Sequence, residues 1–272
     1  MLKSNYTPRS LILEAFIWAN LSFLSVDIWF AHSYNSFEEL GEWIPFFFSI
    51  GGSLILLPGL LWLFFKKSVS RYTYNTGLLI GYLSIAVGIL GTWFHLESHF
   101  FQSFTLKSLV YSAPFMAPLA YAGLGFLLVL NRKISSTDVD WARWVIFFGW
   151  GGILGNFLLT LCDHAQNGFF SAAEWIPVVV SAIGLGFFTR LLFDYKSKGF
   201  VNICLGICVL QAVTGLLGLY FHLAVDIKGA ATQMSDLVFG APVFAPLLFV
   251  NLALLLGFGI WELKKLTPEL SK

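Results

Sequence analysis

HSYNSFEELGEWIP (residues 32–45) and HAQNGFFSAAEWIP (residues 164–177) share seven identical residues in one ungapped frame. The shared pattern is H-x-x-N-x-F-x-x-x-x-E-W-I-P. A second pattern follows each stretch: FHL (94–96), LV (109–110) and APFMAPL (113–119) return as FHL (221–223), LV (237–238) and APVFAPL (241–247). The chain therefore contains a tandem duplication, and each copy carries two His and one Glu in these patterns.

The composition is that of a membrane protein. Of 272 residues, 57% are hydrophobic and 11% are charged, whereas about a quarter of the residues of a soluble domain are charged. The mean hydropathy is +0.78, and the apolar runs are long enough for several spans of about 20 residues. The run after Lys3 and Arg9 continues past Phe30 without a small-residue cleavage site. We interpret it as a first membrane helix rather than a signal peptide.

We predict an all-α integral membrane fold, because a spanning segment must satisfy its own backbone hydrogen bonds. The apolar runs divide into eight transmembrane helices, approximately Leu11–His32, Trp43–Phe65, Thr76–Leu96, Ser108–Leu130, Trp144–His164, Trp175–Asp194, Phe200–His222 and Leu237–Trp261. Four spans return the chain to its starting side. Residues 1–133 and 134–272 are therefore expected to form two tandem four-helix repeats, related by a pseudo-twofold axis along the membrane normal.

The basic residues predict the orientation. Fourteen of the 16 Lys and Arg residues fall on the side of the N-terminus, and only Lys107 and Lys228 fall opposite. By the positive-inside rule both termini are cytoplasmic. The outer face then receives the repeated polar residues, which end the odd-numbered spans or open the spans that follow: His32, Glu42, His95, His164, Glu174 and His222.

Four His and two Glu at one depth indicate a transition-metal site for iron, zinc, copper or manganese. His99 and Asp226 follow His95 and His222 by one helical turn, which predicts a shared face. The predicted ligands are His32, Glu42, His95 and His99 in the first copy, and His164, Glu174, His222 and Asp226 in the second. Asn35 and Asn167 would orient them, and Asp163 would assist His164. One shared metal, a bridged dinuclear centre and one metal per copy all fit the pattern.

Two other interpretations account for part of the pattern. Haem held by two His is the alternative cofactor, although it does not require the repeated Glu residues. His at a helix end and Glu at a helix start are also favoured by the helix dipole, so the pairs could be structural caps. Capping does not explain why all four helix ends carry His, and ionisable residues at membrane depth are functional by default.

The A-P-x-x-A-P segments predict a bent, closely packed outer end for the fourth and eighth spans, because proline disrupts a helix interior. Polar residues inside the spans are few, and no continuous polar path runs inward from the outer cluster. This counts against an ion channel or a proton pump. Cys162, Cys204 and Cys208 do not have the spacing of a redox or zinc motif.

The leading hypothesis is redox or metal-assisted chemistry at the outer face, acting on a small or membrane-soluble molecule. The alternatives are a b-type haem protein, a metal or solute transporter or metal-delivery protein, and a non-catalytic membrane subunit that docks a periplasmic partner. The expected surroundings are the lipid bilayer and a periplasmic small molecule or partner protein. No nucleic-acid partner is expected, because the chain has no basic tract interleaved with aromatic residues.

Overall fold

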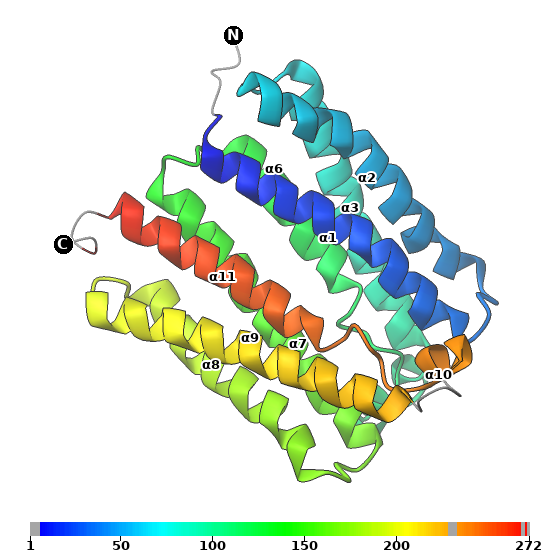
Figure 1. The fold of residues 1–272 in the computed structure, drawn as a ribbon. Coiled ribbons are helices and arrows are strands. Elements are labelled where there is room, and N and C mark those ends of the chain that lie inside the picture. Colours follow the sequence, from blue (N-terminus) through cyan, green and yellow to red (C-terminus); the bar gives the residue numbers. More distant parts are fainter. Residues whose placement is uncertain (1–5, 228–232, 268–269, 271–272) are drawn as a thin grey trace.

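Helices account for all the regular structure that a computed structural model describes for residues 6–227, 233–267 and 270 (Figure 1). The long helices are α1 (Pro8–Ser33), α2 (Leu40–Lys66), α3 (Arg71–Glu97), α6 (Leu119–Lys133), α7 (Val139–Gln166), α8 (Trp175–Phe193), α9 (Lys198–Asp226) and α11 (Leu247–Leu266). The short helices are α4 (Phe100–Ser103), α5 (Leu106–Val110), α10 (Met234–Phe239) and a 3₁₀ turn at Ala172–Glu174.

Within the described ranges, seven helices are long and apolar enough to cross a membrane: α1, α2, α3, α7, α8 with its 3₁₀ turn, α9 and α11. Their outward faces carry many exposed large apolar side chains, among them Ile12, Leu54, Trp93, Val209 and Leu254. Such faces suit contact with lipid chains. The prediction of an all-helical fold is confirmed, and these long apolar helices are compatible with a polytopic membrane protein.

The fourth predicted span, Ser108–Leu130, is not one continuous helix. α5 ends at Val110, and α6 begins only at Leu119 and has 15 residues. At 1.5 Å per residue α6 is about 22 Å long, short of the roughly 30 Å hydrocarbon core. Eight continuous spans are therefore not found in the described part of the chain.

The two A-P-x-x-A-P segments are turns that precede helices rather than bent helix ends. Pro118 and Pro246 are the N-cap residues of α6 and α11, so the eighth predicted span also starts later than Leu237. Proline has no backbone N–H and clashes with the preceding turn of a helix, but it fits at a helix start. The prolines therefore decide where both helices begin.

The helices pack as two closed groups of four. In the first group, α1 and α3 each contact both α2 and α6. In the second group, α7 and α9 each contact both α8 and α11. The packing of α6 against α7 joins the groups, and these two helices lie behind α1 and α11 in Figure 1.

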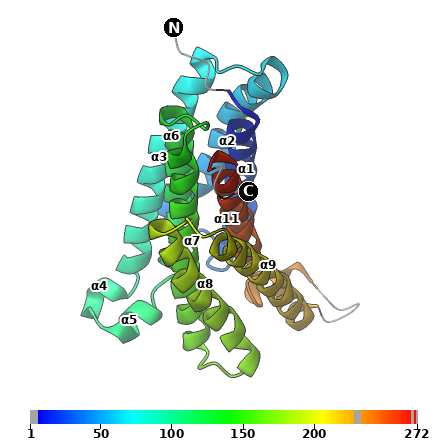
Figure 2. The same cartoon turned by 90° about the vertical axis from the view of Figure 1, so that its left-hand side faces the viewer.

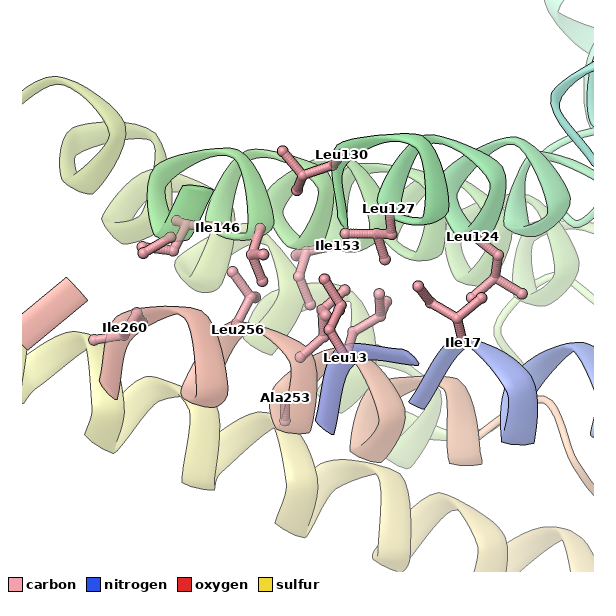
Figure 3. Packing of buried hydrophobic residues seen from close by; sticks show 14 of the residues in the cluster. Leu13, Ile17, Leu124, Leu127, Leu130, Ile146, Ile153, Ala253, Leu256 and Ile260 are labelled. Atoms are coloured by element: carbon pink, nitrogen blue, oxygen red, sulfur yellow. The ribbon is translucent and has the colours of Figure 1, made fainter. Parts of the chain in front are cut away.

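One buried core runs across the junction of the groups. Figure 3 shows Leu13 and Ile17 of α1 facing α6, with Ile153 of α7 and Leu256 of α11 beside them. These four side chains are almost completely inaccessible. The two groups therefore share apolar packing in addition to their own interiors.

The long helices alternate in direction, so their ends gather at two levels. We call one level the basic end; it holds Arg9, Lys66, Arg71, Arg132, Arg190 and Lys264. We call the other level the His/Glu end, where α4, α5 and α10 also lie (Figures 1 and 2). At the basic end Arg132 forms a buried ion pair with Glu14 and donates Nε–H to the Thr73 carbonyl at 3.0 Å. This pair fastens α6 to α1 and α3.

Candidate functional site

The turn after α1 and the turn after α7 have the same backbone form. Ser36 and Phe37 have φ of 60° and 53°, and Gly168 and Phe169 have φ of 73° and 51°. The Phe37 N–H donates to the His32 carbonyl at 3.1 Å, and Phe169 makes the same bond to His164 at 3.1 Å. Both turns therefore close directly onto the carbonyl of the repeated His.

An aromatic stack then packs each turn against the first turns of the helix that follows. The Phe37 ring stacks on Trp43 with ring centres 4.3 Å apart, and Phe169 stacks on Trp175 at 4.0 Å. Because Glu42 and Glu174 directly precede these tryptophans, the stack brings each carboxylate back to the helix end that carries His. This explains why Phe, Glu and Trp recur at a fixed spacing.

Each repeated Glu lies against the Nδ1 atom of the preceding His. His32 Nδ1 is 3.2 Å from Glu42 Oε1, and His164 Nδ1 is 3.4 Å from Glu174 Oε2. Asn35 Nδ2 donates to Glu42 Oε1 at 2.5 Å, so Asn35 has the orienting position expected of it. The Asn167 side chain makes no hydrogen bond within the described residues.

His95 and His222 instead bond to proline carbonyls. His95 Nδ1 is 2.9 Å from Pro114 O, and His222 Nδ1 is 2.8 Å from Pro242 O. Each ring therefore ties the end of α3 or α9 to the turn that leads into α6 or α11. Neither proline carbonyl was predicted as a partner, because the contact joins segments separated in sequence.

A second hydrogen bond holds each of these turns. Ser98 Oγ accepts from the Ala113 N–H at 2.9 Å, and Asp226 Oδ1 accepts from the Ala241 N–H at 2.9 Å. One carboxylate oxygen of Asp226, which was predicted as a metal ligand, is thus bound to a backbone N–H. Ser98 was not predicted to have a role, because the neighbouring His99 was the ionisable residue and was chosen as the candidate ligand.

Two predicted members lie outside these contacts. α3 ends at Glu97, and His99 precedes α4. The prediction that His95 and His99 share one helical face is therefore wrong. Its side chain is exposed and forms no hydrogen bond in the described part. Asp163 likewise makes no hydrogen bond to His164 there.

Two imidazoles of the first group lie close together. The ring centres of His32 and His95 are 6.2 Å apart, with planes at 71°. In the second group His164 and His222 interact electrostatically, but no ring contact between them is found among the described residues. The first group therefore has the tighter pair.

The hydrogen bonds to the proline carbonyls assign the tautomers of His95 and His222. A carbonyl oxygen can only accept, so these two rings carry a proton on Nδ1. The carboxylate oxygens near His32 Nδ1 and His164 Nδ1 favour the same tautomer in those rings. In a neutral ring Nε2 then carries a free lone pair. No hydrogen bond to these Nε2 atoms occurs in the part of the chain that the structure describes.

The eight predicted ligands do not converge on one point. Across residues 6–227, 233–267 and 270, no three His, Cys, Asp or Glu side chains gather as a metal-holding group. In each group, one ring instead donates Nδ1–H to a proline carbonyl, and the Nδ1 atom of the other ring lies beside a carboxylate.

A polar contact that the sequence analysis did not identify lies inside the first group. The buried Tyr121 hydroxyl donates to the Pro45 carbonyl at 2.9 Å and contacts Ser49 Oγ. Asp27, one of the few polar residues inside the spans, interacts electrostatically with both His32 and Tyr121. In the sequence, this part of the second span could have been noticed because Ser49 and Gly52 recur as Ser181 and Gly184 in the second copy.

None of the family models, curated proteins or solved structures compared with this chain matches it. The roles of the residues are therefore argued from their geometry.

Proposed function

We propose that the chain is an integral membrane protein built from two diverged copies of a four-helix unit, related by a pseudo-twofold axis along the membrane normal. Both termini are cytoplasmic, and the His/Glu end faces outward. Two observations support this: the turns after α1 and α7 share their φ values and aromatic stacks, and all the basic residues that the structure describes except Lys107 lie at the basic end.

At the His/Glu end, we propose a transition-metal site that uses His32 and His95 as ligands through Nε2. The observation that carries this is that both Nδ1 atoms are committed to acceptors, a carboxylate for His32 and a carbonyl for His95. Metal-binding His residues characteristically donate their other ring N–H to such groups. Glu42 then acts as a positioning residue rather than as a ligand.

The spacing of the two rings supports the same pairing. A metal ion about 2.1 Å from one nitrogen of each ring brings the ring centres to roughly 5–6 Å from each other. The His32 and His95 ring centres are 6.2 Å apart, close to this range. His164 and His222 form the corresponding, more open pair of the second copy.

Two protein nitrogens leave the remaining coordination positions to water or a small molecule. A structural zinc site has four protein ligands, and an open position marks a site that exchanges or reacts. The exposed Glu38 and Glu39 of the adjacent loop add negative charge that attracts cations. We therefore favour an exchangeable metal site, suited to delivering an ion or to open-site chemistry on a small molecule.

The test uses substitutions that separate the two ring nitrogens. Asn reproduces the Nδ1–H donor of His but has nothing in the place of Nε2. We expect His32→Asn and His95→Asn to keep the thermal unfolding midpoint and to lose stoichiometric binding of Cu²⁺ or Zn²⁺, measured by metal analysis of detergent-purified protein. His99→Asn is the matched control, because it removes a nearby exposed His without a hydrogen bond among the described residues.

Copper electron paramagnetic resonance supplies the second readout, since two bound imidazoles give nitrogen hyperfine structure that each Asn variant should reduce. Binding that survives both His32→Asn and His95→Asn would refute the site. A Soret band in the purified protein, lost in His95→Asn, would replace the proposal by haem.

A structural role is the second candidate, and the proline carbonyl bonds favour it. If His95 and His222 serve only to fasten the turns before α6 and α11, Asn should replace them fully. This alternative would be established if the Asn variants unfold at the same temperature as the unmodified protein and the unmodified protein binds no metal.

A further inference from the structure

A cavity of about 440 Å³ lies at the basic end, between the start of α1, the connection from α6 to α7, and α11. Its lining includes Thr7, Arg9, Ile12, Thr137, Glu262 and Lys265. These segments come together at the side where α1 begins and α11 ends (Figure 1). The volume falls within the range of small-molecule sites.

The charged groups of the lining form one network. Glu262 is buried and forms ion pairs with Arg9 and, at 3.0 Å, with Lys265. Arg9 Nη1 also donates to the Ser136 carbonyl at 3.2 Å. One carboxylate thus holds two cationic side chains at the cavity, which leaves one net positive charge and spare N–H donors.

Spare Arg and Lys donors around a cavity favour an anion, and both phosphate and carboxylate oxygens are suitable acceptors. The Lys265 side chain is about half exposed, so its ammonium group can reach a ligand while Arg9 remains paired with Glu262. The lining hydroxyls are engaged with each other or with neighbours: Thr7 Oγ1 lies 2.6 Å from Ser136 Oγ, and Thr137 Oγ1 lies 2.9 Å from Ser135 Oγ.

We propose that this cavity binds the phosphodiester headgroup of an anionic phospholipid. The cavity lies where spanning helices end, which is the level of lipid headgroups. Ile12, one of its lining residues, is half exposed on α1 and offers an apolar wall for the start of an acyl chain. Basic pockets between membrane helices on the cytoplasmic side are suited to such headgroups.

A bound lipid would also bridge the two helix groups. Arg9 and Ile12 belong to α1 of the first group, whereas Lys265 belongs to α11 of the second. The lipid therefore acts as a clamp at the basic end, where the ion pair of Arg9 with Glu262 already links α1 to α11. This inference goes beyond the metal site and does not depend on it.

Adjacent lysines provide the matched pair of variants. Lys265→Gln removes a cationic donor from the cavity but leaves Arg9 paired with Glu262. Lys264→Gln removes the same charge from the same turn of α11, where Lys264 donates to Asn202 at 2.7 Å outside the cavity. A third variant, Ile12→Trp, fills the cavity from its half-exposed wall and leaves every charge in place.

The measurement is native mass spectrometry of the full chain, released from nanodiscs that contain phosphatidylcholine and phosphatidylglycerol. We expect wild type and Lys264→Gln to retain one phosphatidylglycerol. Lys265→Gln should reduce this retention about fivefold relative to Lys264→Gln, because only Lys265 lines the cavity. Ile12→Trp should reduce it at least as far.

Three results would overturn the proposal. The first is equal retention by Lys265→Gln and Lys264→Gln, and the second is equal retention of phosphatidylcholine. The third is thermal stabilisation by millimolar inorganic phosphate without any retained lipid, which would assign the cavity to a soluble anion. Loss of folding in Ile12→Trp would not protect the proposal, because the lysine pair tests it separately.

Discussion

At the scale of single residues, the Glu42 carboxylate lies within reach of three nitrogen atoms. It faces His32 Nδ1 at 3.2 Å, accepts from Asn35 Nδ2 at 2.5 Å, and accepts from the Glu39 N–H at 3.3 Å. Its position beside Nδ1 favours one tautomer of the His32 ring and fixes the orientation of the ring. In the proposed metal site, the carboxylate would orient the ring so that Nε2 binds the metal, and would not bind the metal itself.

Glu42→Gln tests this role with almost no change of shape. The amide oxygen still accepts from Nδ1, but the negative charge is gone, so we expect metal affinity to fall about 10–100-fold with stoichiometry retained. Isothermal titration with Zn²⁺ measures the change. Glu38→Gln, an exposed position in the same loop, should lower the affinity much less, because it removes only a general attraction for cations. An equal fall in both variants would mean that the loop charge matters only as a general attraction.

At the scale of elements, the turns before α6 and α11 determine how closely these turns pack against α3 and α9. Pro118 Cβ lies 2.8 Å from the position that a side chain at Gly91 would occupy, and Pro246 Cβ lies 2.9 Å from the corresponding position at Gly218. The prolines thus pack directly on the backbones of α3 and α9. This close approach holds the turn carbonyls within reach of His95 and His222.

Two glycines of α6 test how tightly α3 and α6 are packed. A Cβ at Gly125 would lie 2.4 Å from the Gly81 carbonyl oxygen, whereas a Cβ at Gly123 would meet nothing within 4 Å. We expect Gly125→Ala to lower the free energy of unfolding by about 1–3 kcal/mol. Gly123→Ala should raise it by about 0.5–1 kcal/mol, because alanine favours the helix. Thermal unfolding in detergent, followed by circular dichroism, measures both; a harmless Gly125→Ala would contradict the packing.

At the scale of the whole molecule, the basic residues and the His/Glu pairs lie at opposite ends. Lys196 is exposed between α8 and α9 at the basic end, and Glu38 is exposed between α1 and α2 at the other. In a membrane this polarity should give one orientation, with the basic end cytoplasmic. The metal site would then meet ions from outside the cell.

Cysteine labelling tests this orientation in a variant whose Cys162, Cys204 and Cys208 are replaced by Ala. We expect Glu38→Cys to react with a membrane-impermeant maleimide in intact cells. Lys196→Cys should react only after the membrane is permeabilised, which also serves as the control for its accessibility. The reverse pattern would invert the orientation and move the His/Glu end to the cytoplasm.

Most of the helical architecture could be predicted from local features of the chain. Long apolar runs specify spanning helices, because backbone polar groups in lipid must bond within their own segment. The predicted bounds differ most at Pro114 and Pro118, where a run that is apolar throughout contains no continuous helix. Ser108–Leu130 was predicted as one span from its apolar character. That character does not show that Pro114 and Pro118 lack the backbone N–H that a continuous helix needs.

The candidate site was predicted in part. The sequence by itself determined the repeated His, Asn, Phe, Glu and Trp, the polarity of the ends and the helical class, since each follows from residue identity and spacing along the chain. Only the tertiary structure decided that Pro114 and Pro242 engage His95 and His222, that His32 approaches His95, and that His99 lies apart. Those contacts depend on how closely separate helices pack at glycine and proline, which is a property of the assembled bundle and not of any one segment.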